Sequence, residues 1–187
     1  MGEITPNEIS SVVRSSDCIY SESEVELAID NLANLIAAQV ATKNPILLCA
    51  MNGGLIVTGK LATRLQFPLQ IDYVHATRYR GNTSGADLQW KNYPSLDMKG
   101  RAIIIIDDVF DEGFTLESLV NFCHEKQAAD VLTAVLVNKV HDRKKTSLTV
   151  DFVGLETGDR YLYGYGMDYK GFLRNAAGIY AVSNEDS

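Results

Sequence analysis

Apolar residues along this chain alternate between two patterns. Short continuous runs, such as residues 46–50 and 102–106, are typical of parallel strands that are buried on both faces. Between such runs, apolar residues recur every three or four positions, as from Val25 to Val40, and this spacing predicts helices. The pattern predicts helices at 25–40, 55–65 and from 115 onward, and strands at 46–50, 70–77, 102–106, 131–137 and 151–155.

Strands and helices in this order predict an α/β protein. Their spacing suits right-handed strand–helix–strand crossovers, which lay successive strands parallel to one another. We therefore expect a single domain over residues 1–187, built as an open, mostly parallel twisted sheet flanked by helices. Ligands bind beyond the carboxyl ends of the strands in such sheets. The residues that follow each strand are thus the candidates for chemistry.

Local signals predict two further features. Ser21 and Glu24 form a capping-box pattern at the start of the first predicted helix. Residues 78–92 are polar, include Gly81 and Gly85, and predict a long loop. A loop of that length without structure of its own is usually functional or disordered.

Composition narrows the class of protein. With 187 residues and 46% hydrophobic content, the chain can bury one substantial core. Its net charge of −7 argues against nucleic acid as a partner, because non-specific nucleic-acid affinity comes mainly from cations that neutralise phosphates. No apolar run is long enough to span a bilayer, residues 1–10 lack a signal-peptide pattern, and the three cysteines show no disulfide or zinc spacing. We expect a cytoplasmic protein without membrane contact.

The most informative segment is 101–119. A run of four isoleucines ends at Asp107 and Asp108, and two more acids precede Gly113 and Thr115. Backbone N–H groups in a glycine-containing turn at a helix N-terminus form an anion site, to which Thr115 adds a hydroxyl donor. The neighbouring carboxylates would repel a bare phosphate, so sugar hydroxyls or Mg²⁺ are their expected partners. A solvated turn is the alternative, and it explains four acids around a buried strand end less well.

This segment resembles the phosphoribosyl-pyrophosphate-binding motif of type I phosphoribosyltransferases, in which a hydrophobic strand and two acids precede Asp-Thr-Gly-x-Thr or a close variant. Glu112 departs from the commonest residue, threonine, and we expect its side chain to point away while its backbone N–H still binds phosphate. The resemblance implies that Asp111 is the catalytic base and that Asp107 and Asp108 hold the ribose and Mg²⁺. It places the 5'-phosphate on Glu112, Gly113, Phe114 and Thr115.

Three other segments are similar to the hypoxanthine-guanine branch of that family. Residues 50–54 resemble its pyrophosphate loop, which carries a non-proline cis peptide; here that bond is Met51–Asn52. The family often has lysine where this chain has Asn52. The resemblance implies that Asn52, Gly53 and Arg174 contact pyrophosphate. A plain Gly-Gly turn is the alternative for residues 52–54 alone.

The other two segments concern the purine. Lys139 resembles the lysine that donates to the 6-oxo group, although a lysine after a strand is usually a surface residue. Residues 151–174 resemble the base-binding hood, in which Tyr161 matches the stacking aromatic, Leu162 matches the residue whose backbone contacts the base, and Asp168 matches a second Mg²⁺ ligand. We expect the hood to combine about 151–182 with the N-terminal segment. Arg78 and Tyr79 match the start of a mobile loop, about 78–92, that closes over the substrates.

The resemblance implies purine salvage by transfer of the 5-phosphoribosyl group from phosphoribosyl pyrophosphate to hypoxanthine or guanine, with IMP or GMP and pyrophosphate as products. Its ligands would be phosphoribosyl pyrophosphate, a 6-oxopurine and Mg²⁺, in a homodimer or homotetramer. The alternative from another class is a regulatory protein on the same fold that binds nucleotide or RNA without catalysis. A transferase for another base, such as xanthine or a pyrimidine, is a further alternative.

Overall fold

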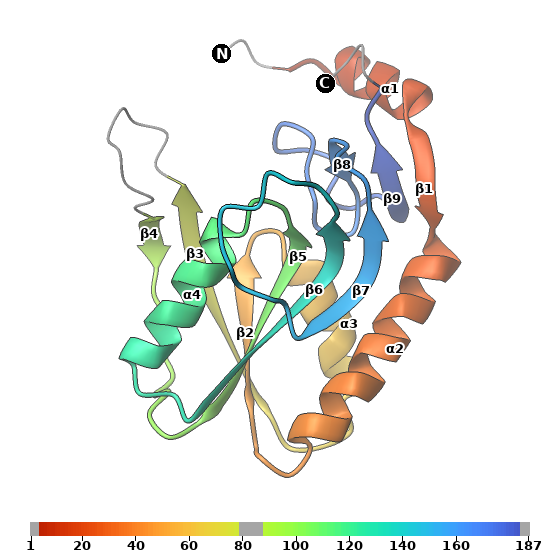
Figure 1. Cartoon of the computed structure of the whole chain (residues 1–187). Helices are drawn as coiled ribbons and strands as arrows, with labels where there is room; N and C mark the ends of the chain where they lie inside the picture. Colours follow the sequence, from red (N-terminus) through yellow and green to blue (C-terminus); the bar gives the residue numbers. More distant parts are fainter. Residues whose placement is uncertain (1–3, 79–87, 184–187) are drawn as a thin grey trace.

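The computed structural model describes residues 4–78 and 88–183, and its centre is a six-stranded sheet (Figure 1). The strand order is β4-β3-β2-β5-β6-β7, with β4 antiparallel to β3 and all other neighbours parallel. The predicted fold class, a mostly parallel open sheet flanked by helices, is therefore confirmed. The strands are β2 (Ile46–Met51), β3 (Gln70–Arg78), β4 (Leu88–Asn92), β5 (Ala102–Phe110), β6 (Asp130–Lys139) and β7 (Phe152–Thr157).

Helices cover both faces of this sheet (Figure 1). Helices α2 (Glu22–Val40) and α3 (Leu55–Arg64) pack on one face, and α4 (Phe114–Glu125) packs on the other. The isoleucine run of β5 serves both cores. Ile104 and Ile106 join the α2 and α3 side, whereas the odd-numbered isoleucines, 103 and 105, join the α4 side. A strand whose successive side chains face opposite layers must be apolar at every position, which explains the unbroken run.

A second, smaller sheet lies at the carboxyl end of the central sheet (Figure 1). Its order is β1 (Asp17–Ser21), β9 (Gly178–Ala181), β8 (Leu162–Tyr163), and helix α1 (Pro6–Ser15) precedes it. The sequence patterns did not predict α1 or β1, although a capping box from Thr5 to Glu8 marks the helix start. The predicted hood range, 151–182, is too wide at its start, because β7 pairs with β6 in the central sheet.

Two central strands are longer than predicted. The apolar run of β5 predicts an end at Ile106, but the pairing of this strand with β6 continues to Phe110 opposite Asn138. Asp107 and Asp108 therefore lie inside the strand, and Lys139 is the last residue of β6. The ladder of hydrogen bonds with a neighbouring strand extends both elements past the point where the apolar run ends. These strand ends hold the polar residues in a rigid backbone.

The predicted loop at 78–92 is wrong at both ends. Strand β3 includes Arg78, and residues 88–92 form β4. Trp90 explains why residues 88–92 form a strand. Its ring stacks on Tyr93 and packs against Phe122 of α4, with ring centroids 5.0 Å and 4.8 Å apart. Local polarity does not indicate such a tertiary contact. Residues 79–87, which include the predicted loop residue Tyr79, lie outside the described residues.

Candidate active site

A cavity of about 510 Å³ opens at the carboxyl ends of the central strands. Segments far apart in the sequence line it: the turn after β2, the ends of β3 and β5, Lys139 of β6, and the residues around β8. This is the edge where ligands bind in open parallel sheets. The predicted site residues that the cavity brings together are Asn52, Gly53, Asp107, Asp108, Asp111, Thr115, Lys139, Tyr161, Leu162, Asp168 and Arg174.

The turn after β2 packs closely against the acids of β5. The Met51–Asn52 peptide bond is cis, as predicted. A Cβ atom at Gly53 would lie 2.3 Å from Asp108 Oδ2, and one at Gly166 would lie 2.0 Å from the Gly53 carbonyl oxygen. Only glycine fits where backbone and side chain approach this closely. The backbone of residues 52–53 thus forms one wall of the cavity without side-chain bulk.

Asp107, which is half-buried, and Asp108, which is buried, form an acid pair. Asp108 is only 8% exposed, and its backbone N–H donates to Asp107 Oδ1 at 2.9 Å. Burial raises the pKa of both carboxyl groups, and the charge of Asp108 raises the pKa of Asp107 further. Two desolvated carboxylates side by side are destabilised unless hydroxyl donors or a cation neutralise them. Their hard oxygen atoms therefore suit ribose hydroxyls or Mg²⁺.

Asp168 and Arg174 face the acid pair from the small-sheet side. Their side chains form an ion pair with 2.7 Å between Arg174 Nη2 and Asp168 Oδ1. Arg174 also donates to the Gly166 carbonyl oxygen at 2.5 Å, and Asp168 accepts from the backbone N–H of Gly171 at 2.6 Å. These bonds fix both side chains at the cavity wall. Arg174 is near enough to lower the pKa of both Asp107 and Asp108.

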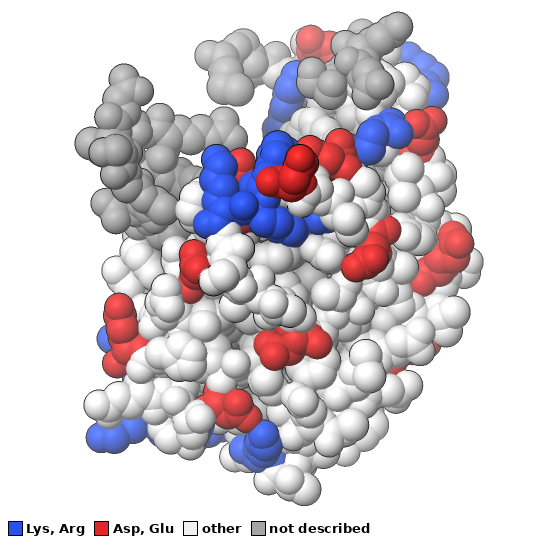
Figure 2. Space-filling model, viewed as in Figure 1, with Lys and Arg blue, Asp and Glu red and all other residues white. Residues whose placement is uncertain are grey.

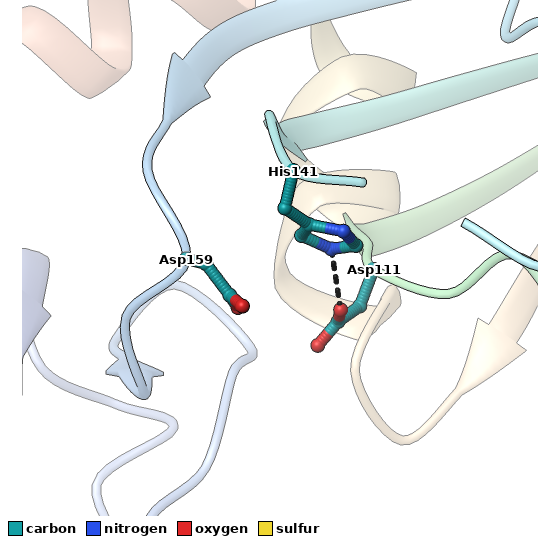
Figure 3. Close-up of side chains that lie close together, drawn as sticks. All are labelled: Asp111, His141 and Asp159. Atoms are coloured by element: carbon teal, nitrogen blue, oxygen red, sulfur yellow. Dashed lines mark hydrogen bonds and ion pairs between the residues drawn. The ribbon is translucent and has the colours of Figure 1, made fainter. Parts of the chain in front are cut away.

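Asp111 lies at the junction of several polar groups (Figure 3). Its Oδ2 accepts a hydrogen bond from Lys139 Nζ at 2.9 Å, and its Oδ1 lies 2.8 Å from His141 Nε2. Lys139 itself is 8% exposed, so it is not the surface residue that a lysine after a strand usually is. Burial acts to raise the pKa of Asp111, but the bond and charge of Lys139, with His141 and Arg143, hold that pKa below its usual value.

A second cavity of about 460 Å³ adjoins the first and shares its acids. Glu112, Gly113 and Thr115 line it, whereas Phe114, the first residue of α4, is outside the lining of these two cavities. Gly113 is the N-cap of α4 with a φ of 93°, and a Cβ there would lie 2.2 Å from Thr146 Cγ2. Glycine is required on both counts. The cavity thus faces the N-terminus of a helix, where backbone N–H groups and the helix dipole attract anions.

Comparison with known families decides the assignment. The family model described as "Phosphoribosyl transferase domain" matches residues 15–169, most of the chain. The chain belongs to the phosphoribosyltransferase family. In this phosphoribosyltransferase the matched range contains β2, β5, α4, β6 and β7, and with them every segment that lines the second cavity.

Curated relatives and solved structures agree with that assignment. The hypoxanthine-guanine-xanthine phosphoribosyltransferase of Tritrichomonas foetus is 26% identical over 157 residues, which cover 84% of this chain and 86% of the relative. The hypoxanthine-guanine phosphoribosyltransferase of Bacillus subtilis is 29% identical over 159 residues, covering 84% and 87%. A solved hypoxanthine phosphoribosyltransferase from Staphylococcus aureus covers 97% of this chain and 98% of its own, with a TM-score of 0.87 and 20% identity. At that identity the likeness shows the fold.

Glu112, which departs from the phosphoribosyltransferase motif, is neutralised by cations from the loop between β6 and β7. Its Oε1 lies 3.2 Å from Lys145 Nζ and 3.5 Å from Arg143 Nη1. Figure 2 shows Lys and Arg side chains gathered over this part of the molecule, beside acidic side chains. The extra carboxylate beside the helix N-terminus is therefore compensated by charge, not merely turned aside.

The sequence patterns missed Lys91, which also lines the first cavity of this phosphoribosyltransferase. His75 of β3 pairs with Asn92 of β4, but the next residue, Ala76, pairs with Trp90, so Lys91 is the extra residue of a β-bulge. Bulges re-aim a side chain, often beside active sites. No local signal in the sequence marks this bulge.

His141 and Arg143 were also missed, because their distance from Asp111 in the sequence hides their contact with it. Near this contact, one carboxylate oxygen of Asp111, one of Asp159 and a ring nitrogen of His141 lie within 4.8 Å of one another (Figure 3). Arg143 already pairs with Asp159 at 2.6 Å and with Asp111 at 3.3 Å. Because a guanidinium neutralises both carboxylates, this cluster does not suit a metal ion.

Proposed function

We propose that this chain transfers the 5-phosphoribosyl group from phosphoribosyl pyrophosphate to hypoxanthine or guanine, yielding IMP or GMP and pyrophosphate in purine salvage. The supporting observation is that one cavity contains both the acid pair, Asp107 and Asp108, and the 2.9 Å contact between Lys139 and Asp111. The acid pair suits a sugar. Lys139 with Asp111 suits a heterocycle that accepts a hydrogen bond from the lysine and loses a proton to the carboxylate.

The phosphate and ribose would occupy adjoining parts of the two cavities. The N-terminus of α4, with Gly113 and Thr115, would bind the 5'-phosphate through backbone N–H groups and the threonine hydroxyl. The carboxylates of Asp107 and Asp108 would accept hydrogen bonds from the ribose hydroxyls. This arrangement is supported by the lining that the two cavities share at 107–109.

The same acids, with Asp168, are the proposed ligands of Mg²⁺. The ion would neutralise charge on the departing pyrophosphate when bound. Asp168 is held at the cavity by Arg174 and by the Gly171 N–H, so its carboxylate is oriented in advance. Asp107 and Asp108 are placed by the rigid backbone of β5.

The purine would lie between Tyr161 and the end of β6. Tyr161 is 38% exposed and lines the cavity beside Leu162, so its ring is available for stacking and the Leu162 backbone for contact with the base edge. The 6-oxo group and N7 are neighbours on one edge of a purine. A lysine ammonium can only donate, which favours an oxo group over an amino group. The adjacent Asp111 is the proposed acceptor for the proton at N7.

Pyrophosphate would bind at the opposite end of the cavity, against Asn52, Gly53 and Arg174. Asn52 brings no charge to this end. We assign that charge to Lys91, which the bulge of β4 directs into the cavity. The pKa of His75 supports this placement: burial lowers it, and the charges of Lys91 and Arg174 lower it further.

Lys91→Ala is expected to raise KM for phosphoribosyl pyrophosphate roughly 10-fold, the loss expected from one charge-assisted bond. KM for hypoxanthine should stay near the wild-type value, since Lys91 lies away from Lys139 in the proposed arrangement. Steady-state kinetics with each substrate varied in turn measures both constants. Lys99→Ala, which removes an exposed lysine outside the cavity lining, is the matched control. Equal changes in the two variants would reject a role for Lys91.

The function is tested by a phosphoribosyl-pyrophosphate-dependent assay with hypoxanthine, guanine, xanthine and adenine, each with and without magnesium. We expect magnesium-dependent nucleotide formation with hypoxanthine or guanine and none with adenine. Absence of product with all four bases would reject the proposal. The alternative, a non-catalytic binding protein on this fold, is favoured by no observation on the described residues.

Among the described residues no helix has both the length and the apolar content to cross a membrane. We propose a cytoplasmic homodimer or homotetramer. Leu27 and Leu35 of α2, which are 61% and 53% exposed, are candidates for the subunit contact. Sedimentation of the wild type beside a Leu27→Glu, Leu35→Glu variant tests this.

A further inference from the structure

His141 follows β6 and points at Asp111 from the side (Figure 3). Its side chain is only 3% exposed. Both ring nitrogens have partners: Nδ1 accepts a hydrogen bond from the backbone N–H of Arg143 at 3.0 Å, and Nε2 lies 2.8 Å from Asp111 Oδ1. The two contacts satisfy both nitrogens of this buried ring, as burial of polar atoms requires, and they fix its orientation.

These two contacts determine which nitrogen of the neutral ring carries the proton. A backbone N–H can only donate, so Nδ1 must present its lone pair to Arg143. The proton of neutral His141 is then on Nε2, and this N–H donates to Asp111 Oδ1. The structure thus builds a fixed donor that approaches one oxygen of the carboxylate.

The donor is itself held in place by an ion pair. The guanidinium of Arg143 binds Asp159 through two bonds, from Nε at 2.7 Å and from Nη2 at 2.6 Å. This bidentate pair ties the loop after β6 to the loop after β7. The backbone N–H that orients His141 therefore has a defined position relative to the sheet.

We propose that His141 is a positioning residue for Asp111 in the transfer reaction, an inference that rests on the proposed function. Its Nε2–H holds Oδ1 so that Oδ2, the oxygen beside Lys139, faces the purine. As pyrophosphate leaves, the bond from C1' to its oxygen breaks and the bond from C1' to purine N9 forms. The purine proton passes from N7 to Oδ2 of Asp111. His141 keeps its own proton throughout.

A matched pair of substitutions tests this role. In His141→Gln the amide nitrogen can reach about as far as Nε2 and still donate to Oδ1, whereas the shorter amide of His141→Asn cannot. We expect His141→Asn and His141→Ala to lower kcat roughly 10-fold, less than the loss of the base itself. His141→Gln should restore most of kcat. The affinity for phosphoribosyl pyrophosphate should not change in any of them. His124→Ala, at an exposed histidine of α4, is the control.

A double-mutant cycle with Asp111→Asn separates positioning from general structural support. If His141 acts through Asp111, the variant with both Asp111→Asn and His141→Asn should be no slower than Asp111→Asn alone. Fully additive losses would overturn the proposal, and so would equal kcat for the Gln and Asn variants. The proposed function is rejected by a different result, a wild-type protein that is inactive with every base. If the wild type is active and His141→Asn has the same kcat, only the role of His141 is rejected.

Discussion

Asp111→Asn is expected to lower kcat about 10²-fold, the smaller end of general-base contributions. The amide keeps the shape of the side chain and can still accept from Lys139 or His141, but it cannot take the purine proton. KM for phosphoribosyl pyrophosphate should change little, because Asp107, Asp108 and the α4 N-terminus hold the sugar phosphate in the proposed arrangement. Single-turnover measurements with hypoxanthine would isolate the chemical step.

The control for this variant is Asp142→Asn, which changes an exposed aspartate in the loop that carries His141. An unchanged kcat in Asp111→Asn would reject the base assignment. The pH profile offers a second check. Because the pKa of Asp111 is held below its usual value, the group is ionised across the neutral range. If the wild-type rate falls between pH 6 and 8, a group other than Asp111 must cause the fall. The same fall should then persist in Asp111→Asn.

Gly53→Ala is expected to reduce kcat/KM by at least about 10²-fold, the cost of displacing reacting groups by about 1 Å. The added Cβ would lie 2.3 Å from Asp108 Oδ2, so either the turn after β2 or the acid pair must move. Gly59→Ala is the matched control. Gly59 is exposed in α3, and an alanine Cβ there would meet no atom within 4 Å beyond its chain neighbours and the backbone of its own helix, so this change should stabilise the helix by up to about 1 kcal/mol.

Thermal unfolding of both variants separates a local effect from a global one. Gly59→Ala should unfold at or above the wild-type temperature and retain full activity. Gly53→Ala should remain folded, because the clash lies at the cavity and not in either helix-covered core. If Gly53→Ala kept wild-type kinetics, the cavity wall formed by residues 52–53 would tolerate a Cβ atom, and the prediction would be wrong.

Most of the central sheet could be predicted, because β2 and β5 contain unbroken apolar runs that no other element explains as well, whereas β4 lies in a range whose polarity predicts a loop. The small sheet could not. Strand β8 has two residues and β9 has four, too few to show a period, and their pairing depends on tertiary contacts. Helix α1 was missed although Thr5, Pro6 and Glu8 mark its start, since only one of its residues, Val12, is buried.

The same distinction applies to the site. Residues of the turn after β5 lie within one short segment, so a local motif identified them together. Lys91 and His141 depend on a strand bulge and on a contact with Asp111 across 30 positions, and neither leaves a trace in nearby residues.

The compensation of Glu112 by Arg143 and Lys145 has an evolutionary consequence. A chain that acquired glutamate at this position without a partner would place an uncompensated negative charge beside the proposed 5'-phosphate, and selection would remove it. Positions 112, 143 and 145 should therefore change in concert among relatives, with basic residues at 143 or 145 where 112 is acidic and a relaxed choice where it is threonine.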